Sequence, residues 1–287
     1  MPGYQAPLRD MRFLLNEVLR IDSYSNLAGF AEAPPDVIDA ILEGGARFAS
    51  DVLQPLNSVG DRQGCRRNPD ASVVTPDGFI DAYRQMVEGG WMTLSSDPEY
   101  GGQGLPRTIA LVFAEMCSSA NMAFAMYPGL THGAYSAIHA GASDEQKRMY
   151  LPKLATGEWA GTMNLTEPQC GTDLGLIKTK AVSQPDGSYR ITGQKIWISG
   201  GEQDLSANII HLVLARIEGA PEGVKGISLF IVPKVMVGAD GSLGAHNSLE
   251  CGGLEEKMGI HGNATCVMHY DGATGHLVGE AHKGMRI

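Results

Sequence analysis

The hydrophobic pattern of the chain changes near residue 158, and this change constrains the fold more than any other sequence feature. Before it, apolar residues recur at helical spacing, as in Leu8, Met11, Leu15, Val18 and Leu19. After it, short segments rich in Ile, Val and Thr alternate with turns that contain Pro, Asp and Gly. We therefore expect an α+β chain with an all-helical domain over residues 1–158 and a small β-barrel or β-sandwich over residues 159–287.

Helix starts can be placed in the first half from residues that cap helices. Asp36 is positioned to cap one helix, and Thr75 takes the same role before Pro76, which suits the first helical position. Ser143 and Gln146, three residues later, form a capping box. These signals predict several separate helices in the first half of the chain.

The predicted helices are separated by polar or glycine-rich segments. We expect exposed loops over residues 57–72 and 97–104. The glycines of the second loop could cradle a phosphate, but no Gly-Lys-Ser/Thr sequence follows, which disfavours a P-loop. A long helix over residues 108–126 comes next, and Met122 and Met126 are expected to pack in its core-facing side.

The segment MNLTEPQCGTD, residues 163–173, must leave regular structure. Pro168 has no amide hydrogen and Gly171 tolerates a positive φ, so the backbone turns there. Exposed N–H groups and the hydroxyls of Thr166 and Thr172 suit the carbonyls of a flat heterocycle, or a phosphate. An ordinary hairpin connection is the alternative. Glu167 is expected to hold the turn by accepting backbone N–H bonds.

The segment Lys195-Ile196-Trp197-Ile198-Ser199 alternates as a strand does. Trp197 and Ser199 lie two residues apart and are expected to project to the same face. An indole beside a hydroxyl can stack on a planar ring and hydrogen-bond to its edge. A Trp that only packs on a sheet is the alternative.

In this order the two segments resemble motifs of the acyl-CoA dehydrogenase family, a TEP-x-x-G-[ST]-D loop followed by a K-x-W-I-[ST] strand. The resemblance covers essentially the whole chain, including GLEEKMGIHGNATCVMHYDG (residues 253–272), and looks most like the long-chain branch. It implies FAD as cofactor, bound by Met163, Leu165, Thr166, Gly171, Thr172, Trp197, Ile198 and Ser199. Met163, Leu165 and Thr166 would line the isoalloxazine edge. Gly171 and Thr172 would face the flavin phosphates and the acyl-CoA. Trp197 would stack near the ring, and Ser199 would lie close to N5. Cys170 and Leu176 depart from the small residues usual in the family.

The resemblance also implies an activity and its partners. The expected reaction is α,β-dehydrogenation of an acyl-CoA thioester to the 2-enoyl-CoA, with an electron-transfer flavoprotein as acceptor and a homo-oligomer when full length. The family's catalytic base lies in a C-terminal helical domain that would follow Ile287, so no catalytic residue is nominated and this part alone is expected to be inactive. An acyl-CoA oxidase, a flavin monooxygenase of the same fold and a silent acyl-CoA or flavin-binding module remain alternatives.

Composition disfavours several other classes of protein. The net charge of −10 argues against a nucleic-acid partner. Five irregularly spaced cysteines disfavour a disulfide framework and favour a reducing cytoplasm, and no apolar run reaches the length of a membrane span. Cys251, His261, Cys266 and His269 do not predict a metal site, because Cys266 and His269 would face opposite sides of one strand.

Overall fold

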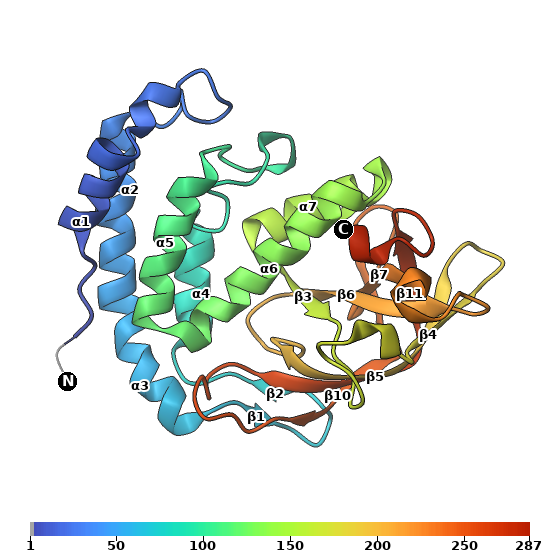
Figure 1. Ribbon diagram of the computed structural model, residues 1–287. Coiled ribbons are helices and arrows are strands. Elements are labelled where there is room, and N and C mark those ends of the chain that lie inside the picture. The colour runs from blue at the N-terminus through green and yellow to red at the C-terminus, as the bar shows by residue number, and fades with distance from the viewer. Residues whose placement is uncertain (1–2) are drawn as a thin grey trace.

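Helices and strands occupy separate parts of the molecule. The computed structural model describes residues 3–287, and Figure 1 shows the helices, blue to green, beside a β-structure coloured yellow to red. Within that range no helix combines the length and apolarity needed to cross a membrane. The proposed domain boundary at residue 158 falls between the last long helix and the first strand of the main sheet.

The helices are α1 (Leu8–Phe13), α2 (Pro35–Arg47), α3 (Gln54–Gln63), α4 (Phe79–Glu88), α5 (Arg107–Ala120), α6 (Met122–Gly141) and α7 (Asp144–Thr156). The strands are β1 (Arg66–Arg67), β2 (Val73–Val74), β3 (Trp159–Asn164), β4 (Lys180–Ser183), β5 (Tyr189–Ser199), β6 (Asn208–Ile217), β7 (Ile227–Pro233), β8 (Val235–Val237), β9 (Leu243–His246), β10 (Leu249–Leu254) and β11 (Thr265–Val278). The helical half thus also carries a short hairpin, β1–β2.

The main sheet closes into a small barrel, which confirms the expected α+β fold. The hydrogen-bonded pairs β11–β5, β5–β4, β4–β6, β6–β7 and β7–β11 form an unbroken circuit. Strand β3 extends the sheet as a parallel neighbour of β6, and β10 is antiparallel to β11. Closure removes the exposed sheet edges along the circuit.

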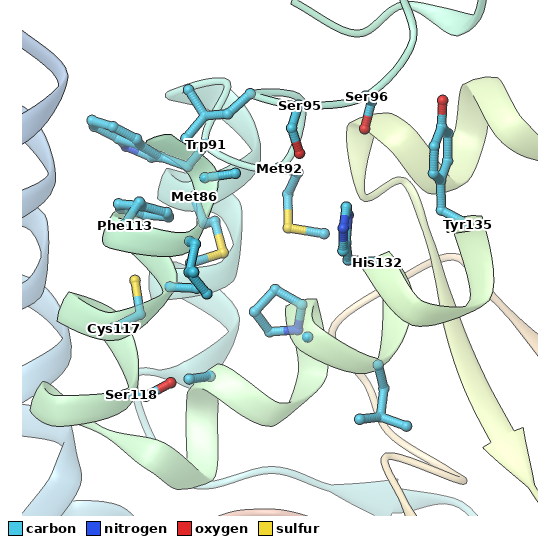
Figure 2. Close-up of a pocket in the computed structure, with 18 of the residues that line it drawn as sticks. Met86, Trp91, Met92, Ser95, Ser96, Phe113, Cys117, Ser118, His132 and Tyr135 are labelled. Carbon is cyan, nitrogen blue, oxygen red and sulfur yellow. The ribbon is translucent and has the colours of Figure 1, made fainter. Parts of the chain in front are cut away.

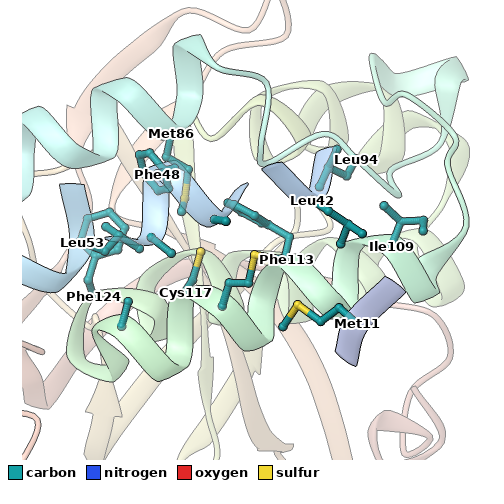
Figure 3. Close-up of a cluster of buried hydrophobic side chains, with 14 of the residues drawn as sticks. Met11, Leu42, Phe48, Leu53, Met86, Leu94, Ile109, Phe113, Cys117 and Phe124 are labelled. Carbon is teal, nitrogen blue, oxygen red and sulfur yellow. The ribbon is translucent and has the colours of Figure 1, made fainter. Parts of the chain in front are cut away.

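The helices have their own apolar core, separate from that of the barrel (Figure 3). A group of aromatic rings packs in it: Phe113 of α5 stacks on Trp91 with ring centroids 4.6 Å apart, and Phe48 packs on both. A third cluster lies between α6, α7 and the outer faces of β3, β6 and β7. This third cluster attaches the helices to the barrel.

Two helix starts differ from the expectation. Helix α4 begins at Phe79, not at Pro76, because the Thr75 hydroxyl and amide instead donate to Asp204, at 2.7 and 3.2 Å. Helix α2 begins at Pro35, so Asp36 lies in its first turn and is not its cap. The Ser143–Gln146 capping box at the start of α7 is confirmed.

Two loop and helix boundaries were also wrong. Residues 57–72 were expected to be a loop, but α3 continues through Gln63 and buries Gly60 against Phe79. The helix expected over residues 108–126 is broken at Asn121, whose side chain caps α6 by accepting from the Phe124 amide at 3.1 Å. Apolar periodicity continues across this break, which explains why the pattern concealed it.

Candidate functional site

A buried ion pair holds the turn that follows β3. The Glu167 side chain is 3% exposed and that of Lys195, on β5, 0%, and their Oε1 and Nζ atoms lie 2.9 Å apart. Glu167 also accepts the backbone N–H groups of Lys178 and Thr179, at 2.7 and 3.0 Å. The carboxylate therefore binds the turn to both β5 and the segment before β4, the role expected from the sequence.

The charges of this pair are mutually dependent. Burial opposes ionisation of Glu167, but the Lys195 ammonium and the backbone hydrogen bonds outweigh it and lower the pKa of Glu167 to about 2. Burial lowers the pKa of Lys195, and Glu167 opposes that change. With either partner removed, the other would be a buried charge without compensation.

The structure brings the two motif segments side by side. The Ile196 amide donates to the Thr166 carbonyl at 3.0 Å, and Lys195 Nζ donates to the Leu165 carbonyl at 3.0 Å. Residues 163–173 and 195–199 thus form one unit, which we call the loop–strand site. Cys170 belongs to it as well, since its backbone exchanges hydrogen bonds with Glu167.

Trp197 lies on a β-bulge that sequence analysis did not foresee. The register jumps from Cys266 opposite Ile198 to Met268 opposite Lys195, and Trp197 has a φ of 61°. Its side chain is 44% exposed, with Lys257 Nζ 5.5 Å from the ring centroid. A non-glycine residue in this backbone region is strained, which marks the position as one of functional interest.

The predicted site residues differ in what they offer a ligand. Among residues 3–287 no side-chain hydrogen bond engages the hydroxyls of Thr166, Thr172 or Ser199, all at least partly exposed. Met163 and Leu165 are half-buried against the layer under α6 and α7. Ile198 is 2% exposed in the barrel core, so only its backbone could reach a ligand.

Gly171 does not adopt the positive φ that its residue type permits. A Cβ built at this position would lie 3.3 Å from Cγ2 of Thr166, a tighter contact than most Cβ atoms make. The glycine is therefore explained by the close approach of Thr166, not by the turn conformation.

A second feature is a largely apolar cavity among α4, α5 and α6, which we call the helical cavity (Figure 2). Its volume is about 340 Å³. Sulfur-bearing side chains are frequent in its lining: Met86, Met92, Cys117, Met122 and Met126.

Met122 and Met126 thus line a cavity, whereas core packing was expected for them. His132 of α6 is the imidazole of the lining, and its ring stacks on Tyr135 with centroids 6.4 Å apart. Burial, together with the charge of Arg107, lowers the pKa of His132, so the imidazole is neutral at neutral pH. The cavity therefore suits an apolar group more than a charged one.

The five cysteines are all free thiols, and four of them are buried. In the described part of the chain no three His, Cys, Asp or Glu side chains converge as metal ligands would.

Comparison with known proteins identifies the family. Residues 39–158 match the profile "Acyl-CoA dehydrogenase, N-terminal domain" and residues 162–273 match "Acyl-CoA dehydrogenase, middle domain". The chain belongs to the acyl-CoA dehydrogenase family. The family expected from the two motifs is thereby confirmed.

Individual members of the acyl-CoA dehydrogenase family align over most of the chain. It is 47% identical to 3-methylmercaptopropionyl-CoA dehydrogenase of Ruegeria pomeroyi, over 99% of this chain and 48% of that protein. It is 38% identical to a butyryl-CoA dehydrogenase of Syntrophomonas wolfei, over 97% of this chain and 47% of that protein.

Among solved structures, the acyl-CoA dehydrogenase of Bacillus anthracis complexed with FAD superposes with a TM-score of 0.71 at 27% identity, over 89% of this chain and 39% of that chain. The present chain spans about half the length of the curated relatives it matches.

Proposed function

We propose that this chain forms the helical and barrel parts of an FAD-dependent acyl-CoA dehydrogenase, which converts an acyl-CoA thioester to the 2-enoyl-CoA. The observation that carries the proposal is the loop–strand site. Its two motif segments are joined by the hydrogen bond from Ile196 to Thr166 and by the buried pair of Glu167 and Lys195. Such anchoring fixes a surface in advance of binding, which a flat cofactor requires.

The residues of the loop–strand site fit a flavin. Thr166, Thr172 and Ser199 offer hydroxyls that other side chains do not use, and Trp197 offers a half-exposed aromatic face. We assign Met163, Leu165 and Thr166 to the ring edge, Gly171 and Thr172 to the phosphate and acyl-CoA side, and Trp197, Ser199 and the Ile198 backbone to the ring. Bound there, FAD would supply the hydride acceptor that no side chain can provide.

We further propose that the helical cavity receives the acyl group. Its lining is mostly apolar, and burial keeps its histidine neutral. The aligned relatives are named for 3-methylmercaptopropionyl-CoA and butyryl-CoA, which supports a short acyl chain as substrate. The thioether-rich lining suits a polarisable group such as a second thioether.

Partners of the whole protein are part of the same proposal. An electron-transfer flavoprotein as acceptor and a homo-oligomeric assembly rest on family membership, and a reducing cytoplasm rests on the five free cysteines. An oxidase or a flavin monooxygenase would differ in the access of oxygen to the reduced flavin. A silent binding module would hold the ligands without turnover.

A visible absorbance titration of the purified chain tests the proposal. We expect FAD to bind and to acquire the resolved bands of an enclosed flavin, after which butyryl-CoA is added. Bleaching under anaerobic conditions would support dehydrogenation, whereas bound flavin that never bleaches fits both a part of the enzyme that is inactive alone and a binding module. A chain that takes up no FAD would contradict the proposal.

Matched variants locate the flavin. Trp197→Ala and the pair Thr166→Val with Thr172→Val should each weaken FAD binding at least tenfold without unfolding the protein, since each removes groups assigned to the cofactor. Thr192→Val, elsewhere on β5, serves as the control. Equal affinities in the variants and in the control would remove these residues from the site.

A further inference from the structure

Four polar side chains form a continuous hydrogen-bonded chain inside the barrel. The hydroxyl of Tyr270 on β11 lies 2.8 Å from Asn164 Oδ1, and Asn164 Nδ2 lies 2.8 Å from Thr162 Oγ1, both on β3. Thr162 Oγ1 in turn lies 2.7 Å from Nδ1 of His211, its cross-strand neighbour on β6. All four residues are buried. The group uses three strands and ends at an imidazole.

The phenol and the amide fix the direction of two of the three hydrogen bonds in this group of side chains. The Tyr270 hydroxyl donates to the amide oxygen of Asn164, so the amide nitrogen of Asn164 donates to Thr162. The Thr162 oxygen accepts from Asn164, and because its hydroxyl proton meets no acceptor other than His211 among residues 3–287, we assign it as the donor to Nδ1 of His211. This assignment places the proton of the neutral imidazole on Nε2, which has no hydrogen-bond partner in residues 3–287.

Tyr270 and His211, the two end groups of the hydrogen-bonded chain, stay neutral at ordinary pH, which preserves the directions of the hydrogen bonds. Burial raises the pKa of Tyr270 well above its ordinary value. Burial, with smaller contributions from Lys234 and His246, lowers the pKa of His211 to about 3. Both groups are thus neutral between acid and strongly basic conditions. A fully buried donor without a partner costs free energy, so the arrangement calls for a compensating role.

The position of Asn164 indicates that role. Among the described strands, β3 is paired only with β6, so its outer edge has no strand neighbour. Asn164 is the last residue of β3 and separates Met163 from Leu165, which we assign to the flavin edge. Its side chain points into the barrel, where Tyr270 is, while Met163 and Leu165 pack on the opposite layer.

We propose that Asn164 is a positioning residue for the flavin site, and that the Tyr270–Asn164–Thr162–His211 chain holds the end of β3 in register with the cofactor. This inference rests on the proposed function. The ion pair of Glu167 and Lys195 anchors the turn from the β5 side. The hydrogen-bonded chain anchors the preceding residues from within the barrel. Residues 163–166 are thereby fixed from two directions.

Substitutions at Thr162 test the proposal with matched shapes. Thr162→Ser keeps the hydroxyl, whereas Thr162→Val keeps the shape and removes it. We expect the serine variant to bind FAD within twofold of the wild type. The valine variant should bind at least tenfold more weakly and shift the flavin absorbance maximum. Equal affinities and spectra for the two variants would overturn the proposal.

A third variant separates positioning from stability. Ile191→Val removes apolar packing from the same barrel core on β5, where Ile191 pairs with Ala181 and Ala273 and with no member of the polar chain. We expect it to lower the unfolding midpoint as Thr162→Val does and to leave the flavin spectrum unchanged. A spectrum altered as much as that of Thr162→Val would reduce the effect to general destabilisation and overturn the proposal.

Nitrogen-15 NMR of the imidazoles supplies a readout that needs no cofactor. Wild-type His211 should show the proton on Nε2, and Tyr270→Phe should disturb that signal from the far end of the chain. A proton on Nδ1 would overturn the assigned direction of the Thr162–His211 bond, and a His211 signal unchanged in Tyr270→Phe would overturn the hydrogen-bonded chain and leave the proposed function intact. A wild-type chain that binds no FAD would instead contradict the proposed function, and with it the flavin role of Asn164.

Discussion

The loop–strand site and the helical cavity are held in shape by different kinds of interaction. The loop–strand site is held by charge and hydrogen bonds: a buried ion pair, backbone bonds to a carboxylate and a strained Trp197. The helical cavity is lined by thioethers and small residues that contribute shape and few polar contacts. Polar networks specify one geometry, whereas methionines adapt to different shapes. The comparison indicates that the loop–strand site, which we propose holds the cofactor, is rigid, and that the helical cavity, which we propose receives the acyl group, is easily altered.

The prediction with the largest expected effect tests the rigidity of the loop–strand site. Lys195→Met leaves the Glu167 carboxylate buried without its partner and should lower the free energy of unfolding by about 3–5 kcal/mol. Urea denaturation measures this loss. The double variant Lys195→Met, Glu167→Leu should recover most of it, because no buried charge remains.

The control for this prediction is an exposed pair of similar geometry. Lys153 Nζ lies 2.6 Å from Glu158 Oε2, and the two side chains are 41% and 48% exposed. Lys153→Met should therefore cost only about 0–1 kcal/mol. Losses of the same size at Lys153 and Lys195 would contradict the view that burial makes the Glu167 pair structurally decisive.

Acid should weaken the same pair. The pKa of Glu167 is about 2 in the folded chain against an ordinary value of 4.5, so the ionised carboxylate stabilises the fold fully above pH 4.5. As the pH falls from 4.5 toward 2, the unfolded chain takes up a proton that the folded chain refuses, and stability decreases. Unfolding midpoints across this range should fall more steeply for the wild type than for Glu167→Gln. Parallel curves would count against the assignment.

Filling the helical cavity with a larger side chain tests whether the acyl group binds there. A Cβ at Gly129 on α6 would meet no atom within 4 Å, and Gly129 lines the cavity. Gly129→Met should weaken butyryl-CoA binding about tenfold, or about 1.4 kcal/mol. It should leave FAD affinity unchanged and stabilise the helix by about 0.5–1 kcal/mol.

Gly133 on the same helix provides the matched control. Its Cβ would also meet no atom within 4 Å, but Gly133 is not part of the cavity lining. Gly133→Met should give the same gain in helix stability with unchanged butyryl-CoA binding, measured by calorimetry. If the two variants bind acyl-CoA equally well, the acyl group lies elsewhere.

The sequence predicted the two regions unequally, for physical reasons. The loop–strand site was predicted because its residues are close together in the chain and Pro168 must interrupt regular structure. The helical cavity was missed, since its lining comes from separate helices, and Met122 and Met126 look the same in sequence whether they face a core or a cavity.

Other errors arose where tertiary contacts override local signals. Thr75 looks like a helix cap but bonds to Asp204, far along the chain. The bulge at Trp197 depends on how β5 pairs with β11, which the alternation of apolar residues on β5 alone does not reveal. The break at Asn121 lies within a continuous apolar pattern, so the periodicity predicted one helix where the structure has two, α5 and α6.

The smallest expected effect shows whether ligand binding simply follows stability. Ser143 Oγ accepts the Gln146 amide at 3.2 Å at the start of α7, and Ser143 contributes to neither the loop–strand site nor the helical cavity. Ser143→Ala removes this cap and should lower the free energy of unfolding by about 1 kcal/mol, measured by urea denaturation. FAD and butyryl-CoA affinities, measured where the variant is fully folded, should stay within twofold of the wild type. Affinities that fall with stability in Ser143→Ala would mean that the two regions are coupled through the whole fold, and the contrast between a rigid and an adaptable site would then lose its basis.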